Sequence, residues 1–212
     1  MLATGQANAL RLTPDQVKRS LRRILLVLAG CVVVWPVVRY AYRPVYAELG
    51  AAAVNLIGTD ITVVPEHQTE GEIARDTPLM DTVFHFDHKL YGRGGGAIPA
   101  SSFYHAYLPT AILVAFMWGA REGTLRSKRK ALLLALLVLH VFLVLRLSSA
   151  VTLQLAASTV DEKPVLALGE WSSKALRYVK DLFWDNAIST ILVPILVWAL
   201  FAFDPPPKES PV

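Results

Sequence analysis

The chain has 212 residues, of which 54% are hydrophobic and 18% charged, and its formal net charge is +4. This apolar content, with a positive mean hydropathy, exceeds that of an ordinary soluble domain and indicates one domain embedded in a membrane. The basic residues stand beside apolar runs, where they fit topology signals and anionic lipid headgroups, so nucleic acid is excluded as the expected partner. A single cysteine, Cys31, excludes an intrachain disulfide and any multi-cysteine metal site.

The N-terminal part of the chain predicts a basic arm and a first membrane span. Residues 1–23 form the arm, in which Thr13-Pro14-Asp15-Gln16 contains the residues of a helix start. The apolar run at about 24–42 is interpreted as an uncleaved anchor rather than a signal peptide, because no small-x-small cleavage site follows it. Residues 44–57 would extend only ~21 Å as a helix, which predicts an interfacial or re-entrant helix.

The polar segment that follows predicts short strands and a loop. Ile61-Thr62-Val63-Val64 has the β-branched composition of a strand, and short strands are also expected around Glu72–Arg75 and Thr82–Phe86. The glycine-rich sequence Gly92-Arg93-Gly94-Gly95-Gly96 is expected to be a flexible connector.

Three further apolar runs complete a membrane domain that we assign to residues 24–203. The remaining elements are spans at about 102–120, 131–157 and 187–203, an amphipathic surface helix at 171–183, outer loops at 43–101 and 158–186, and a polar tail at 204–212. The predicted fold class is an all-α integral membrane protein of about four transmembrane helices. Interfacial helices and a small extracytoplasmic region with short strands complete it.

The orientation of the spans follows from the Lys and Arg residues that flank them. The N-terminal arm carries five, and so does the 121–130 loop. In contrast, the 65–100 segment has three against six acidic residues, and the 159–186 segment has four against five. Both termini and the basic loop are therefore expected in the cytoplasm, with the chain in an inner (plasma) membrane and the two acidic segments outside.

This topology brings the start of the second span and the end of the third to the same side of the membrane. Ser101 and His105 are four residues apart and share a helix face, and Arg146, ~24 Å along a helix from Lys130, is expected in the outer part of the bilayer. A serine needs a base to become nucleophilic and a fixed cation stabilises an oxyanion, so Ser101, His105 and Arg146 are the candidate catalytic residues. In the structural alternative, His105 belongs to an interfacial aromatic belt and Arg146 snorkels or pairs with Asp185.

The other histidines predict no cofactor and no metal centre. His140 lies near mid-membrane and is expected to hydrogen-bond another span rather than to serve a proton relay or a haem. His67 and the sequence His85-Phe86-Asp87-His88 offer ligands for a divalent metal, but on one strand His85 and His88 point to opposite faces. We therefore expect neither a bound metal nor a cofactor.

The order of these elements resembles the exosortase/archaeosortase family of multi-span transpeptidases. Ala100-Ser101-Ser102-Phe103 stands where that family has an Ala-Cys-Ser-Gly-like motif, so Ser101 takes the place of the cysteine. The sequence Phe142–Leu147 resembles the later Asn-x-x-Arg-Ile-like motif and contributes Arg146, without the asparagine. Asp185-Asn186 stands where a third basic residue follows in the family. The resemblance implies a lost or altered activity, because serine is far less nucleophilic than cysteine without a base.

The incomplete catalytic set favours a non-catalytic accessory or assembly subunit of an inner-membrane complex. Its expected partners are membrane lipids and another membrane protein. The competing hypothesis is an exosortase-like processing or transpeptidase enzyme that uses Ser101 with His105 and Arg146.

Overall fold

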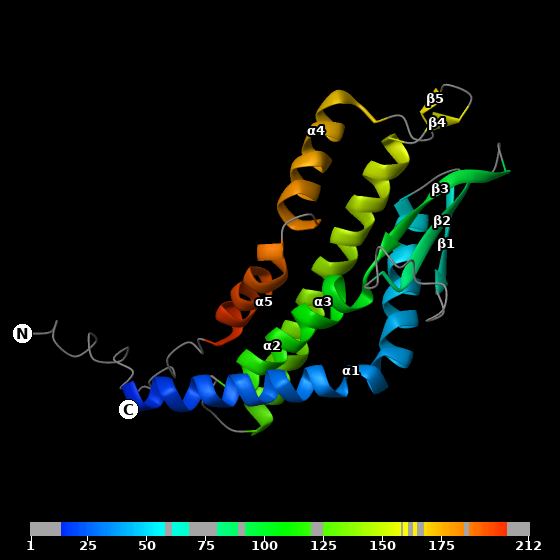
Figure 1. Cartoon of the computed structure of the whole chain (residues 1–212). Coiled ribbons are helices and arrows are strands. Elements are labelled where there is room, and N and C mark those ends of the chain that lie inside the picture. The colour runs from blue at the N-terminus through cyan, green and yellow to red at the C-terminus, as the bar shows by residue number, and fades with distance from the viewer. Residues whose placement is uncertain are drawn as a thin grey trace, which may run out of the picture.

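The computed structural model shows a mostly helical molecule with a small antiparallel sheet toward one end (Figure 1). It describes residues 14–57, 61–67, 80–88, 92–119, 125–157, 159–160, 163–164, 168–184 and 187–202. The helices are α1 (Pro14–Ile57), α2 (Leu108–Gly119), α3 (Leu125–Ala157), α4 (Glu170–Val179) and α5 (Ala187–Ala202), with π-helical segments η1 (Phe103–Tyr107) before α2 and η2 (Lys180–Trp184) after α4. The strands are β1 (Ile61–His67), β2 (Thr82–His88), β3 (Gly92–Ala100), β4 (Thr159–Val160) and β5 (Lys163–Pro164). The predicted strand at Glu72–Arg75 and the tail at 204–212 lie outside the described residues.

Helix α1 continues without a break through the two segments that the sequence pattern separates. It begins at Pro14, where a helix start is predicted, and runs on through Pro36 and Pro44. The prediction of a separate short helix over 44–57 is therefore wrong. Figure 1 shows α1 as two arms that meet at a bend, which is the usual effect of proline inside a helix.

The second arm of α1 stays helical because it buries one face. Ala47, Ala51 and Val54 follow each other at spacings of four and three residues, and all three are buried in the core that α1 shares with the sheet and α3. Gly50 allows α1 to approach α3 closely. A Cβ atom at Gly50 would lie 2.0 Å from Cδ2 of Leu147, which is itself fully buried.

Strands β1, β2 and β3 form an antiparallel sheet in chain order. The predicted strands at Ile61–Val64 and Thr82–Phe86 are confirmed, and both extend two or three residues further, as β1 and β2. The fold is mostly helical with a small region of short strands, as predicted, and these strands form a three-stranded sheet that packs on the second arm of α1. Asn55 fastens this sheet to the helix, since its side-chain amide accepts the N–H of Val63 at 2.7 Å and donates to the Val63 carbonyl at 3.1 Å.

The glycine run is part of strand β3, so the prediction of a flexible connector at Gly92–Gly96 is wrong. His85 of β2 pairs with Ala97, and Asp87 pairs with Arg93, so β3 has extra residues between the two pairs. Such residues form a β-bulge, in which glycine is favoured because it adopts unusual backbone conformations.

Helices α1, α2, α3 and α5 pack against one another. Helix α2 lies against α1 and α5, and α3 lies against α1 and α5 as well. The crossing of α1 and α2 is close at Gly119, where a Cβ atom would lie 2.8 Å from the backbone nitrogen of Ile24. Further along, the Tyr107 hydroxyl donates a hydrogen bond to the Cys31 carbonyl at 2.7 Å, and the ring of Trp35 lies 4.5 Å from that of Tyr107.

Two helices in the described part of the chain are long and apolar enough to cross a membrane, Pro14–Leu56 and Arg129–Ala157. The helix Ile188–Phe201 is apolar but shorter. Within the most apolar 18 residues of each long helix, the buried share is 0% for the first and 33% for the second. Much of the apolar surface of α1 is therefore exposed on the outside of the protein.

Candidate functional site

The residues predicted to be catalytic lie where the sheet meets the helices. Strand β3 ends at Ala100, and Ser101 and Ser102 lead directly into η1 and α2. Helix α3, which carries Arg146, packs against both η1 and β3. Ser101 is 1% exposed and Arg146 is 3% exposed, so both side chains are enclosed by the protein.

Ser101 caps the helix that follows it. Its Oγ accepts the backbone N–H of Tyr104, three residues further on, at 3.2 Å. This is the hydrogen bond of an N-cap serine, and a cap of this kind contributes about 1 kcal/mol to stability. The Ser101 oxygen therefore already has a structural role in the helix start.

His105 lies beside Ser101, as the four-residue spacing predicts, but their contact runs through the Ser101 backbone. The N–H of Ser101 donates to Nδ1 of His105 at 3.2 Å, and the N–H of His105 donates to the Ser101 carbonyl at 2.9 Å. Because Nδ1 accepts the amide, its lone pair is not available to take a proton from the serine hydroxyl. The arrangement resembles a capping box, in which a side chain of the first turn reaches back to the N-cap amide.

Asp81 completes this helix start, and sequence reasoning missed it. Its carboxylate accepts the N–H of Ser102 at 2.8 Å and the Oγ–H of Ser102 at 2.5 Å, and the Thr82 hydroxyl donates to it at 3.3 Å. Its negative charge also faces the positive end of the helix dipole. Asp81 reaches Ser102 because Thr82 pairs with Ala100 across β2 and β3. No local signal in the sequence marks this residue, since the contact depends on strand pairing.

Arg146 is a buried cation, and Tyr46 of α1 lies near both it and Asp81. Tyr46 is 4% exposed, and the charges of Arg146 and Asp81 both act on its hydroxyl. That hydroxyl has no hydrogen-bond partner among the described residues. Snorkelling to an exposed interface does not describe Arg146, because the protein itself encloses it. The predicted partner Asp185 lies outside the described residues.

His140 hydrogen-bonds another helix, as predicted. Its Nε2 lies 3.0 Å from the hydroxyl of Tyr42 in α1, and that hydroxyl lies 2.9 Å from Oγ1 of Thr110 in α2. Nδ1 of His140 lies 2.8 Å from the Leu136 carbonyl, and the Thr110 hydroxyl donates to the Ala106 carbonyl at 2.9 Å. The chain of contacts joins α1, α2 and α3 through polar side chains.

The remaining histidines form no metal centre in the part of the chain that the structure describes, where no group of three suitable ligands occurs. His85 Nε2 lies 2.7 Å from Oε2 of Glu66 on the exposed face of the sheet. Arg43 Nε donates to Nδ1 of His67 at 3.3 Å. Partial burial, together with the nearby Arg43, lowers the pKa of His67 from its usual 6.5.

Comparison of the chain with protein-family models, with curated proteins and with solved structures gave no match. The resemblance to exosortases and archaeosortases stays a prediction that rests on the short motifs alone. The fold and site define a class: a mostly helical protein with two helices of membrane-spanning length, a small sheet, and a buried polar cluster where the two meet.

Proposed function

We propose that this chain is a multi-pass inner-membrane protein that acts as a non-catalytic accessory or assembly subunit. The observation that carries the proposal is the use of Ser101 and His105 in a buried helix start. A nucleophile has to meet its substrate, whereas Ser101 is 1% exposed. The serine that stands at the position of the family's cysteine is thus accounted for by its part in the fold.

Four apolar elements support a four-span arrangement. Helices α1 and α3 have membrane-spanning length. The third element, η1 with α2, covers 103–119, and the fourth, α5, covers 187–202. At ~1.5 Å per residue these two reach roughly 25 Å, somewhat less than the ~30 Å hydrocarbon core, and a locally thinned bilayer accommodates the difference.

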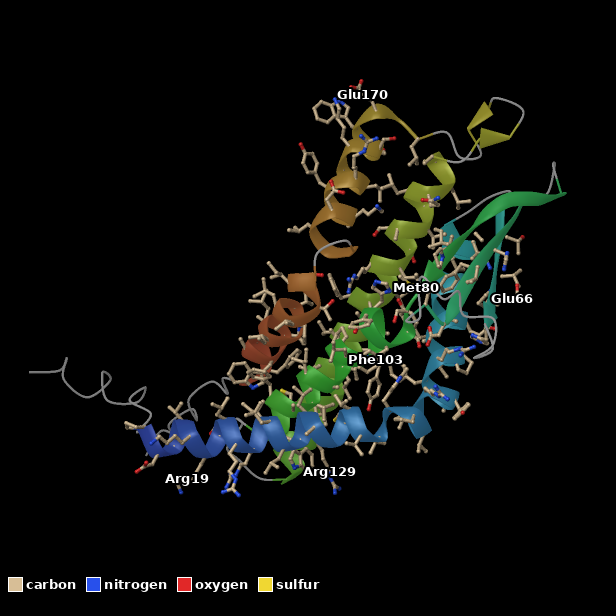
Figure 2. All side chains as sticks on the ribbon, viewed as in Figure 1. Arg19, Glu66, Met80, Phe103, Arg129 and Glu170 are labelled. Atoms are coloured by element: carbon tan, nitrogen blue, oxygen red, sulfur yellow. The ribbon has the colours of Figure 1, made fainter. Side chains whose placement is uncertain are left out.

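The distribution of charge supports an orientation with both termini in the cytoplasm. Figure 2 shows Arg19 and Arg129 at one end of the molecule, whereas Glu170 lies at the opposite end and Glu66 lies on the sheet. The basic residues of the N-terminal arm and the 121–130 loop belong on the cytoplasmic side by the positive-inside rule. The sheet and α4 then face outward.

The exposed apolar surface of α1 supports the proposal that this protein contacts membrane lipids and another membrane protein. Its most apolar stretch has no buried residue, and Val33, Val37 and Leu26 are among its exposed side chains. In water such a surface would drive association, and in a bilayer it offers a face for lipid chains and for another transmembrane helix.

An exosortase-like enzyme remains the second candidate, because one observation favours it. Ser101 and His105 do lie beside each other, at a π-helical segment, and π-helical turns are frequent at functional sites. An enzymatic role would require the helix start to open, so that the Ser101 hydroxyl exchanges the Tyr104 amide for a base and a substrate.

Three substitutions at Ser101 separate capping from catalysis. Ser101→Asn keeps a side-chain acceptor for the helix start and removes the nucleophile, Ser101→Cys keeps a nucleophile and weakens the acceptor, and Ser101→Ala removes both. The buried Ser148, whose hydroxyl donates to a carbonyl of its own helix, supplies the matched control Ser148→Ala. The measurements are protein abundance, and processing of exported proteins in cells that lack the natural chain.

For an accessory subunit, Ser101→Asn supports normal function and any loss in Ser101→Ala follows abundance. For an enzyme, Ser101→Asn and Ser101→Ala lose processing at normal abundance, whereas Ser101→Cys retains it. Purification in mild detergent provides a second measurement. A membrane protein that co-purifies in a fixed ratio, and whose abundance falls when the chain is deleted, is expected for the subunit and not for a stand-alone enzyme.

A further inference from the structure

Helix α4 carries a stripe of exposed aromatic and apolar side chains. The helix packs against α3, yet none of its residues is buried. Trp171 and Tyr178 are 83% and 76% exposed, and Ala175 lies between them. The spacings of four and three residues put the three on one helix face, and the exposed Leu182 of η2 follows four residues later.

Helix α4 also carries exposed basic side chains, and one of them lies beside this stripe. Lys174 forms an ion pair with Glu170 at 2.6 Å, and its Nζ lies 5.6 Å from the centre of the Trp171 ring. Arg177 is also exposed but lies roughly 130° around the helix from the centre of the stripe, so its long side chain would reach the headgroups from the flank. Aromatic rings with flexible basic residues beside them suit the boundary of a bilayer, where rings lie among the upper acyl chains and cations lie at the phosphates.

The position of α4 matches this boundary. It runs alongside the outer end of α3 and leads through η2 to the start of α5, with Glu170 at the end of the molecule that is remote from Arg19 and Arg129 (Figures 1 and 2). The exposed apolar surface continues on α5 at Ile188, Leu192 and Leu196. Because α4 runs along α3 toward the apolar α5, its first turn lies farthest out and η2 lies nearest to the membrane interior.

Building on the proposed membrane function, we propose that α4 and η2 anchor the outer end of the protein in anionic phospholipid, with Leu182 and Tyr178 against the acyl chains and with Trp171, Lys174 and Arg177 among the headgroups. Residues 170–184 carry three basic and two acidic side chains, so the segment has a net positive charge. The anchor keeps α3 and α5 in register on the outer side, where the sheet is also located.

The test places spin labels on the full chain after reconstitution into bilayers. Single cysteines replace Tyr178, Ser172 or Leu137 in a Cys31→Ser background, because Ser172 lies outside the stripe and Leu137 is an exposed position of α3. The label at Tyr178 should meet dissolved oxygen more readily than a water-soluble nickel chelate, like the label at Leu137. The label at Ser172 should show the opposite preference.

The headgroup preference is read from spin-labelled lipids in phosphatidylcholine with and without phosphatidylglycerol. Arg177→Gln should lower the preference for phosphatidylglycerol by up to about fivefold, the factor that corresponds to ~1 kcal/mol per basic residue near a charged surface. Arg177→Lys, which keeps the charge, should retain the preference. An unchanged preference in Arg177→Gln overturns the assignment of the headgroup contact.

The outcomes at the other labels distinguish this inference from the proposal on which it rests. If the label at Leu137 is in the membrane and the label at Tyr178 is in water, the anchor is refuted and the membrane protein stands. If both labels are in water, the membrane function itself fails. If the label at Tyr178 is shielded from both reagents, protein rather than lipid covers α4, which also overturns the inference.

Discussion

Removal of one hydroxyl, in Tyr42→Phe, tests how three helices are joined. The Tyr42 hydroxyl lies 2.9 Å from Oγ1 of Thr110 and 3.0 Å from Nε2 of His140, so it connects α1 to α2 and to α3. Nδ1 of His140 must donate its hydrogen bond, because the Leu136 carbonyl can only accept. In the neutral imidazole, Nε2 then accepts the Tyr42 O–H. Phenylalanine keeps the ring and removes only these interhelical contacts.

The expected loss can be derived from the partners that remain. The Thr110 hydroxyl has one hydrogen, which either the Tyr42 oxygen or the Ala106 carbonyl can accept. Without the Tyr42 hydroxyl this hydrogen goes to Ala106, so the main group left without a partner is Nε2 of His140. Hydrogen bonds between membrane helices contribute about 0.6 kcal/mol on average and up to ~1.7 kcal/mol, and a buried group left unsatisfied costs about 1–3 kcal/mol. We expect Tyr42→Phe to lower the free energy of unfolding by about 1–3 kcal/mol.

A double-mutant cycle with His140→Phe isolates the contact. The double variant should lose less than the sum of the single variants, by about 1 kcal/mol, because removal of both partners leaves no orphan. Unfolding in mixed detergent micelles, followed by tryptophan fluorescence, measures all four proteins. Tyr40→Phe is the control, since Tyr40 is exposed and its hydroxyl accepts a hydrogen bond from the neighbouring Arg39 of the same helix. Strictly additive losses would refute the chain of contacts.

Three further predictions concern other parts of the fold. Asp81→Ala should lower the stability of the protein by about 1–3 kcal/mol, because the helix start after β3 loses its carboxylate. Asp81→Asn, which keeps a side-chain oxygen, should lower the stability less. Equal thermal unfolding of the two variants would contradict the capping role. Gly119→Ala should cost about 1–3 kcal/mol, because the new Cβ would lie 2.8 Å from the backbone nitrogen of Ile24, and Gly30→Ala, where the Cβ meets open space, should be neutral or stabilising by the same assay. Burial and a neighbouring arginine lower the pKa of His67 from 6.5 in the folded chain, so the unfolded chain takes up the proton first. The stability that His67 contributes should therefore be full above about pH 6.5 and should decline as the pH falls through this value toward the folded pKa. The free energy of unfolding of the wild type is compared with that of His67→Gln, and a difference between the two that stays constant between about pH 7.5 and 5.5 would count against the prediction.

Local patterns predicted the elements that depend on local interactions. The apolar run at 131–157 lies inside α3, and the amphipathic run at 171–183 corresponds to α4 and η2. The strand predicted at Thr82–Phe86 lies inside β2. Hydrophobic periodicity and β-branched composition act between residues a few positions apart, so a sequence reports them directly.

The errors fall where a local signal competes with tertiary packing. Pro44 usually ends or bends a helix, but the burial of Ala47, Ala51 and Val54 keeps α1 helical beyond it. The run Gly92–Gly96 has the composition of a flexible connector, but pairing with β2 holds it in a strand with a bulge. In both places, contacts with distant elements outweigh the propensity of the residues themselves.

The sequence by itself determined the apolar class of this protein, its main helices, and the closeness of Ser101 to His105, since helical geometry places residues four positions apart on one face. Only the tertiary structure decided what that closeness means. Asp81 lies twenty-one residues before Ser102 and reaches it through the pairing of β2 with β3. The Ser101 N–H donates a hydrogen bond to His105, and the Ser102 N–H donates one to Asp81. The serine predicted to be a nucleophile therefore forms part of the buried start of a helix.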